Sequence, residues 1–72
     1  MRTFEDDAGG SWDVAVSSGS YGAQILIFAR RQGRELRSFE LEVIGHFDAE
    51  QTLQRMTDDE LRQTLGRSQP LE

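Results

Sequence analysis

The spacing of the apolar residues changes near residue 46, and this change constrains the fold more than any other feature of the chain. Before it, apolar and polar residues alternate, most clearly in residues 12–17 and 36–44. A period of two residues is typical of strands that bury one face. After it, Phe47, Leu53 and Met56 follow the spacing of a helix face. The order of the two patterns predicts an α+β protein.

We expect an antiparallel β-meander of three or four strands in the first part of the chain. Turn-forming residues separate the strands: an Asp-Asp-Ala-Gly-Gly run, a run rich in serine and glycine at residues 17–22, and a Gln-Gly pair at residues 32–33. The predicted strands are residues 3–5, 12–16, 23–31 and 36–44.

One or two C-terminal helices should follow, packed on one face of the sheet. Asp48 is a candidate N-cap for the first helix. Thr57 followed by Glu60 matches a capping box, in which the two side chains accept hydrogen bonds from backbone N–H groups at the helix start. Gly66 is a candidate helix end. The pattern fits either two short helices with a break near Met56 or one bent helix.

Residues 1–70 are predicted to form a single domain with a small core. Leu71 and Glu72 can be native or can begin a cloned purification tag, so they stay outside the functional argument. A chain of 72 residues without cysteine has modest stability, and a second subunit is one way to add to it. The predicted core residues are Phe4, Trp12, Val14, Val16, Ile25, Ile27, Phe39, Leu41, Val43, Leu53, Met56, Leu61 and Leu65.

The predicted strand at residues 23–31 is apolar on both faces, whereas its neighbours are apolar on one. Ile25, Ile27 and Ala29 lie on one face, and Leu26 and Phe28 lie on the other. We assign the isoleucines to the core, which leaves Leu26 and Phe28 on the face that the helices do not cover. Because an apolar patch on a small protein usually marks an interface, Leu26 and Phe28 are interface candidates. The alternative is that the chain covers this face itself.

Four arginines around the predicted third turn form the other candidate contact site. Arg30, Arg31, Arg34 and Arg37, together with Glu35, give this hairpin a local charge of +3. Guanidinium groups at a hairpin tip can bind a carboxylate or a phosphate. The alternative is a solvated hairpin whose charges prevent pairing between sheet edges.

Charge and composition limit the partners. The chain has 8 arginines, no lysine and 13 acidic residues, for a net charge of −5. Such a chain repels nucleic acid and anionic membranes as a whole, so we expect neither as a partner. The absence of cysteine is typical of the reducing cytoplasm.

No set of residues with catalytic, metal-binding or cofactor-binding chemistry stands out. His46 is the only histidine, and without a cysteine or a second imidazole it forms no zinc site. The acidic runs at residues 6–7 and 58–60 suit a turn and a helix start better than a metal site. We therefore expect no enzyme, no metal and no cofactor.

Three motifs span the chain: Phe-x-Asp-x-x-Gly-x-x-Trp-x-Val at residues 4–14, Ser-Tyr-Gly at residues 20–22, and Thr-x-x-Glu-Leu at residues 57–61. In these motifs the chain resembles a group of small uncharacterised bacterial proteins over nearly its whole length. The resemblance implies a bacterial origin and implies no activity.

Together these features predict a non-catalytic, acidic protein-interaction module of the cytoplasm, with homodimerisation as one form of it. Two alternatives stay open. One is an acidic inhibitor that imitates nucleic-acid charge, for which the carboxylates must line one continuous face. The other is a sheet that binds single-stranded nucleic acid through the arginines and Tyr21 or Phe28.

Overall fold

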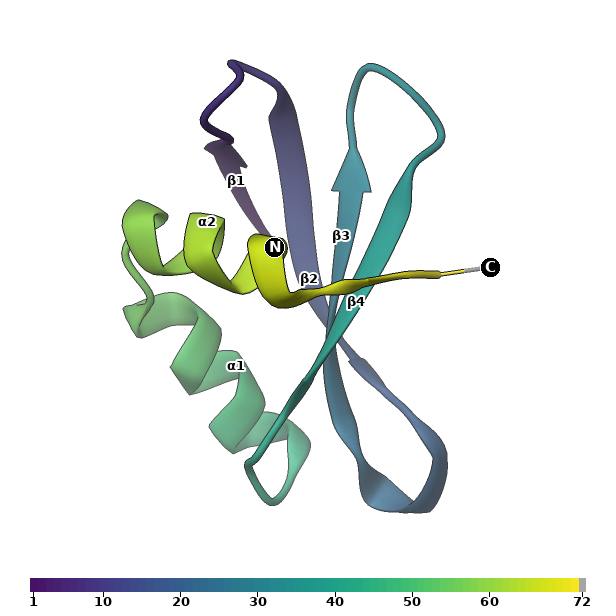
Figure 1. Cartoon of the computed structure of the whole chain (residues 1–72). Coiled ribbons are helices and arrows are strands. Elements are labelled where there is room, and N and C mark those ends of the chain that lie inside the picture. The colour runs from purple at the N-terminus through teal and green to yellow at the C-terminus, as the bar shows by residue number, and fades with distance from the viewer. Residues whose placement is uncertain (72) are drawn as a thin grey trace.

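The computed structural model describes residues 1–71, which form one sheet and two helices (Figure 1). Four strands come first, with a short 3-10 helix, η1, between the second and third. Two helices and a final short strand follow. The elements are β1 (Arg2–Glu5), β2 (Ser11–Ser18), η1 (Ser20–Gly22), β3 (Gln24–Arg30), β4 (Leu36–Leu41), α1 (His46–Arg55), α2 (Asp58–Arg67) and β5 (Gln69–Pro70).

The sheet is antiparallel throughout, and its strand order follows the chain: β1-β2-β3-β4-β5. Both helices lie on the same face of the strongly twisted sheet (Figure 1). The predicted α+β class, with a meander followed by helices packed on one sheet face, is therefore confirmed.

The short strand β5 was not predicted, because all the expected strands precede residue 46. Pro70 lies opposite Arg37 of β4, and the next N–H, that of Leu71, donates to the Leu36 carbonyl at 2.9 Å. Backbone groups alternate in direction along an antiparallel strand, so the missing N–H of proline falls where no ladder bond is needed. Glu72, the second residue of the suspected tag, lies outside the described residues.

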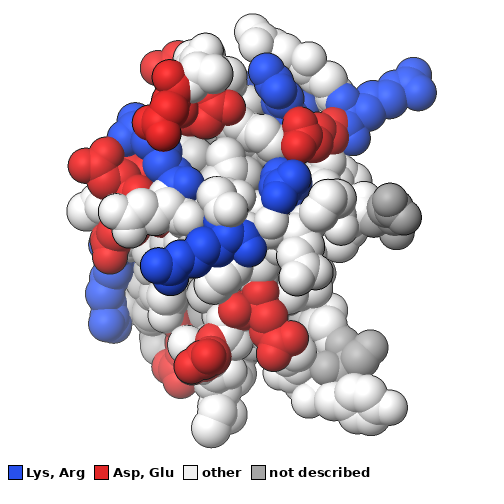
Figure 2. Space-filling model, in the orientation of Figure 1, with Lys and Arg blue, Asp and Glu red and all other residues white. Residues whose placement is uncertain are grey.

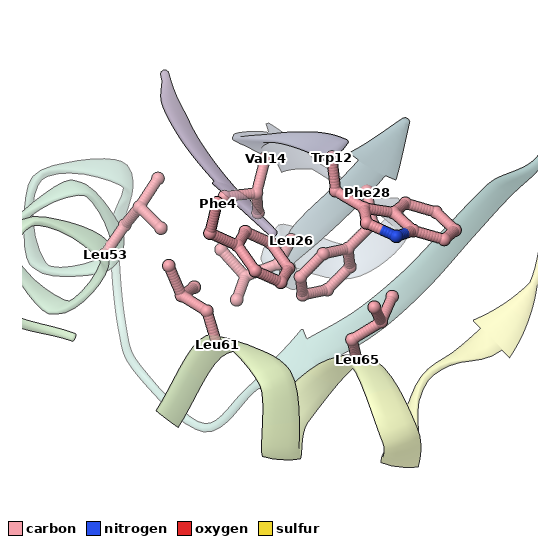
Figure 3. Packing of buried hydrophobic residues seen from close by; sticks show 8 residues of the cluster. All are labelled: Phe4, Trp12, Val14, Leu26, Phe28, Leu53, Leu61 and Leu65. Carbon is pink, nitrogen blue, oxygen red and sulfur yellow. The ribbon is translucent and has the colours of Figure 1, made fainter. Parts of the chain in front are cut away.

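The core lies between the sheet and the two helices (Figure 3). The rings of Phe4 and Phe28 meet edge to face, with centroids 6.0 Å apart and planes at 82°. Such aromatic pairs add to the stabilisation that burial of their apolar surface provides. The buried cluster comprises Phe4, Trp12, Val14, Leu26 and Phe28 from the sheet with Leu53, Leu61 and Leu65 from the helices.

The predicted orientation of β3 is wrong. Leu26 and Phe28 are 0% exposed in the core, whereas Ile25 and Ile27 are half-buried on the opposite face. The register explains this, because Phe28 is paired with Val14 and cross-strand partners share a face. Leu26 and Phe28, the predicted interface candidates, therefore cannot contact a partner from the second face.

The connection from β4 to α1 also differs from the prediction. β4 ends at Leu41, and the chain turns through Gly45, whose φ of 90° is a conformation that glycine adopts readily. Gly45, not Asp48, is the N-cap of α1. Val43 consequently lies outside the buried cluster, and Phe47 is 73% exposed.

The second helix begins as predicted. The Thr57 hydroxyl accepts from the Glu60 N–H at 3.1 Å, and the Glu60 carboxylate accepts from the Thr57 N–H at 2.8 Å. This capping box starts a new helix directly after Met56, so the two-helix form of the prediction is confirmed. The helix continues through Gly66 to Arg67 and is capped by Ser68.

The two faces of β3 can be compared by a pair of substitutions. Phe28→Ala should lower the free energy of unfolding by about 3–5 kcal/mol, because it leaves a cavity in the core. Ile27→Ala should cost about half as much or less, because its side chain is only half-buried. Urea denaturation at one low protein concentration measures both. A larger loss for Ile27→Ala would show that the faces are assigned the wrong way round.

Candidate interaction surface

The structure separates the four arginines of the predicted contact site, here called the arginine hairpin (Arg30, Arg31, Arg34 and Arg37). Arg30 and Arg37 lie opposite Trp12 and Phe28, so both belong to the face that the helices cover. Arg31 forms an ion pair with Asp13 of β2. The hairpin therefore does not present four guanidinium groups as one patch.

Most of these guanidinium groups are occupied within the chain. The guanidinium carbon of Arg30 lies 6.0 Å from the centroid of the Trp12 ring, a cation–π distance. Arg31 donates from Nε to both carboxylate oxygens of Asp13, at 3.0 and 3.1 Å. A hydrogen bond from the Thr3 hydroxyl lowers the pKa of Asp13, and the contact with Arg31 lowers it further. These contacts support a structural role for the arginine hairpin.

Arg37 and Arg2 join the sheet to the ends of the helices. Arg37 of β4 donates from Nε to the Ser68 hydroxyl at 2.7 Å and from a terminal nitrogen to the Ser68 carbonyl. Arg2 of β1 donates to the Leu53 carbonyl at 3.0 Å and also to the Met56 carbonyl. Both arginines thus donate to carbonyl groups at a helix end, where the backbone leaves acceptor positions for side chains.

Two further arginine contacts connect β1 with α2. Arg2 also pairs with Asp58, at the start of α2, at 3.0 Å. Arg62 of α2 reaches back to β1, where its Nε donates to the Glu5 carbonyl at 2.7 Å. That bond occupies a backbone acceptor of β1, a strand that pairs with β2 alone.

Asp6 organises the turn between β1 and β2. Its carboxylate accepts from the N–H groups of Ala8 at 2.9 Å and Gly10 at 2.7 Å, and from the Trp12 indole at 2.8 Å. The indole hydrogen bond, followed by that from Gly10, lowers the pKa of Asp6. A Cβ on Gly10 would lie 2.9 Å from an Asp6 carboxylate oxygen, so a side chain there would displace this carboxylate from its hydrogen bonds. The glycine of the Phe-x-Asp-x-x-Gly-x-x-Trp motif is Gly9, whose φ of 85° is a conformation that glycine adopts readily. Turn structure therefore accounts for the aspartate, glycine and tryptophan of the motif.

Replacing Asp6 should change the response to acid. A carboxyl group with a lowered pKa stabilises the fold above its unfolded-state pKa and loses this contribution as pH falls through the folded value. Wild-type stability should therefore fall below about pH 4 more steeply than that of Asp6→Asn, which cannot ionise. At neutral pH the variant should be the less stable, because its amide places an NH₂ group against the indole N–H. Thermal melts between neutral and acidic pH measure this, and parallel curves would contradict the role of Asp6.

No described element packs over the face of the sheet turned away from the helices (Figure 1). We call it the open face. Ile25 and Ile27 lie at its centre, and no charged residue occurs between Asp13 and Arg30 along the two strands that form its middle. Its apolar residues are Ala15, Ile25, Ile27, Ala29 and Leu36.

The two ends of the molecule differ in the charges that they carry. No arginine occurs in residues 38–54, which contain four acids: Glu40, Glu42, Asp48 and Glu50. We call the end that these residues form with the loop before β3 the acidic end. Figure 2 shows arginines over the upper and middle parts of one face and only acidic groups among the charged side chains at its lower end. At this end, Ile44 is 91% exposed.

The parts needed for binding single-stranded nucleic acid are not brought together. Tyr21 lies in the loop before β3, at the opposite end of the sheet from the arginine hairpin (Figure 1). Phe28 is buried in the core. The open face contains no aromatic side chain on β2, β3 or β4 on which a base could stack.

The remaining chemical candidates form no site within residues 1–71. His46 starts α1 and is exposed, with its Nε2 3.5 Å from a carboxylate oxygen of Glu50. The described part of the chain contains no group of three or more acidic, histidine or cysteine side chains placed to hold a metal ion. None of its helices has the length and apolar character that crossing a membrane requires.

Comparisons of the chain with protein-family models, with curated proteins and with solved structures found no match. The resemblance to small bacterial proteins therefore stays a prediction.

Proposed function

We propose that this chain is a non-catalytic protein-interaction module of the cytoplasm that works as a homodimer joined through its open face. The observation that carries the proposal is the pair Ile25 and Ile27, which stands at the centre of a sheet face over which no described element packs. A small protein that leaves such a face uncovered usually uses it for association.

The shape of the open face is complementary to a second copy of the same face. Ile25 and Ile27 form a ridge along β3, and small residues flank it: Ala15 and Ser17 on β2, and Ser38 on β4. In an isologous dimer the same patch meets itself, so a ridge beside a groove is self-complementary. Each isoleucine ridge can pack against the small residues of the other copy.

On β2, β3 and β4 the open face carries two charged residues, Asp13 and Glu40. Asp13 is neutralised by Arg31 at one end of the face, and Glu40 lies on the β4 side, opposite Ile25. The ridge can therefore pack on Ala15 and Ser17, on the β2 side away from Glu40. A second subunit would also add buried apolar surface to a domain whose own core is small.

The two alternatives receive less support. A charge mimic needs a continuous row of free carboxylates, but Asp13, Asp58 and Asp59 pair with Arg31, Arg2 and Arg62. A nucleic-acid-binding sheet needs an aromatic and basic face, and the open face is aliphatic.

Sedimentation tests the proposal. Wild-type protein should be dimeric at about 10 μM and above, an affinity within the usual range for specific complexes. Ala15→Lys should shift it to monomer, because a lysine would place a charge in the groove beside Ile27 without removing any contact within the subunit. Wild-type protein that stays monomeric up to about 1 mM would contradict the proposal.

A matched control separates the interface from general surface effects. Ile44→Lys introduces the same charge at an exposed position away from the open face and should leave the dimer intact. Both variants should keep cooperative thermal unfolding. If Ile44→Lys dissociates the dimer and Ala15→Lys does not, association uses the acidic end instead.

A further inference from the structure

The outer edge of β4 is only partly paired. β5 lies against Arg37 and Ser38, and no strand of residues 1–71 lies beside Phe39, Glu40 or Leu41 on that side. An unpaired strand edge presents backbone donors and acceptors that another extended chain can use. We call this stretch the β4 edge.

The backbone groups of Glu40 point out from this edge. The Leu36 carbonyl accepts from Leu71 across the edge, so the backbone groups of Leu36 face β5. Direction alternates along an antiparallel strand, and Glu40 is four residues further on. Its N–H and C=O therefore face away from β3.

The edge borders an open hollow of about 460 Å³, which leaves room for another chain. The hollow extends from Gln69 of β5 and Arg67 of α2, along β4, to Glu42. A second hollow of about 670 Å³ continues from Glu40 to Ile44 and Tyr21. An extended segment can thus lie along β4 from the end of β5 toward the acidic end.

Charge argues against a second copy of this chain as the occupant. If two β4 edges paired antiparallel about a twofold axis perpendicular to the sheet, registers centred on residue 40, 41 or 42 would place glutamates directly opposite one another. Like charges at opposed positions destabilise a sheet. The same glutamates favour a partner strand with positive charges at alternate positions.

We infer that the β4 edge binds an extended, basic peptide segment of another protein by strand addition. Lysine or arginine side chains of the segment pair with Glu40 and Glu42 on the open-face side. The apolar residues between them lie on the other side, beside Phe39 and Leu41, which are half-buried. Arg67 places a cation near β5, so the basic residues lie toward Glu42. The hollow includes Ile25 and Ser38 of the open face, so the peptide site adjoins the proposed dimer surface. The strand pairing itself uses the outward backbone groups of β4, so the inference does not depend on whether the open face dimerises.

The probe is an acetylated, amidated hexapeptide of alternating lysine and valine, titrated into ¹⁵N-labelled full chain and followed by amide NMR shifts. Binding should be weak, with a Kd of about 0.1–1 mM, because a short strand pays the full cost of ordering. The Glu40 amide should shift and become protected from exchange. No binding at millimolar peptide, or shifts confined to other surfaces, would overturn the inference.

Two peptide controls separate strand pairing from charge. A form of the lysine–valine hexapeptide in which every backbone nitrogen is methylated keeps the charge but lacks the N–H groups that strand pairing needs, and it should bind at least about tenfold more weakly. A peptide of alternating glutamate and valine should not bind. Equal binding of the N-methylated peptide would show attraction by charge alone and would overturn strand addition.

Protein variants locate the contact. Glu40→Lys should weaken binding about tenfold, because it turns attraction into repulsion. Asp7→Lys changes the net charge equally, at the far end of the sheet, and should have little effect. Glu40→Pro should bind more weakly than Glu40→Gln, since proline also removes the outward N–H and is tolerated at a sheet edge. Equal effects of Glu40→Lys and Asp7→Lys would contradict the assigned edge.

Discussion

Two short helices can cover only one face of this sheet, and the rest of the structure depends on which face of β3 they cover. Leu26 and Phe28 lie in the core, where the Phe28 ring contacts the Phe4 ring edge to face beneath the helices. Ile25 and Ile27 must then lie on the opposite face, because side chains alternate along a strand. The same packing that completes the core therefore creates the apolar surface proposed for association.

Arginine contacts connect this packing to the termini of the helices. Arg2 occupies carbonyl groups at the junction of α1 and α2, and Arg37 does so at the end of α2. In the sequence Arg37 belongs to the predicted basic contact site, but in the structure its guanidinium group binds Ser68 within the chain. The acidic residues between Glu40 and Glu50 have no such arginines near them in sequence, and this asymmetry leaves one end of the molecule negative.

The sequence predicted the fold well where local signals act alone. The alternation around Trp12 and the capping box at Thr57 located β2 and the start of α2. The sequence did not indicate which face of β3 is buried, because a strand that is apolar on both sides has no period that distinguishes them. In the structure the register places Phe28 opposite Val14, and this pairing puts Phe28 on the core face. The contact surface was therefore assigned to the wrong pair of residues, and the open edge of β4 depends on β5, whose two residues have no recognisable strand pattern.

The orientation of β3 can be tested without substitutions, by nuclear Overhauser effects in the wild-type protein. The account predicts contacts between the ring protons of Phe28 and the methyl groups of the helix leucines, of which Leu53 and Leu61 are fully buried. It predicts none between the methyl groups of Ile27 and those leucines. Contacts from Ile27 to the helix leucines, with none from Phe28, would contradict it, since the open face would then present Leu26 and Phe28 instead.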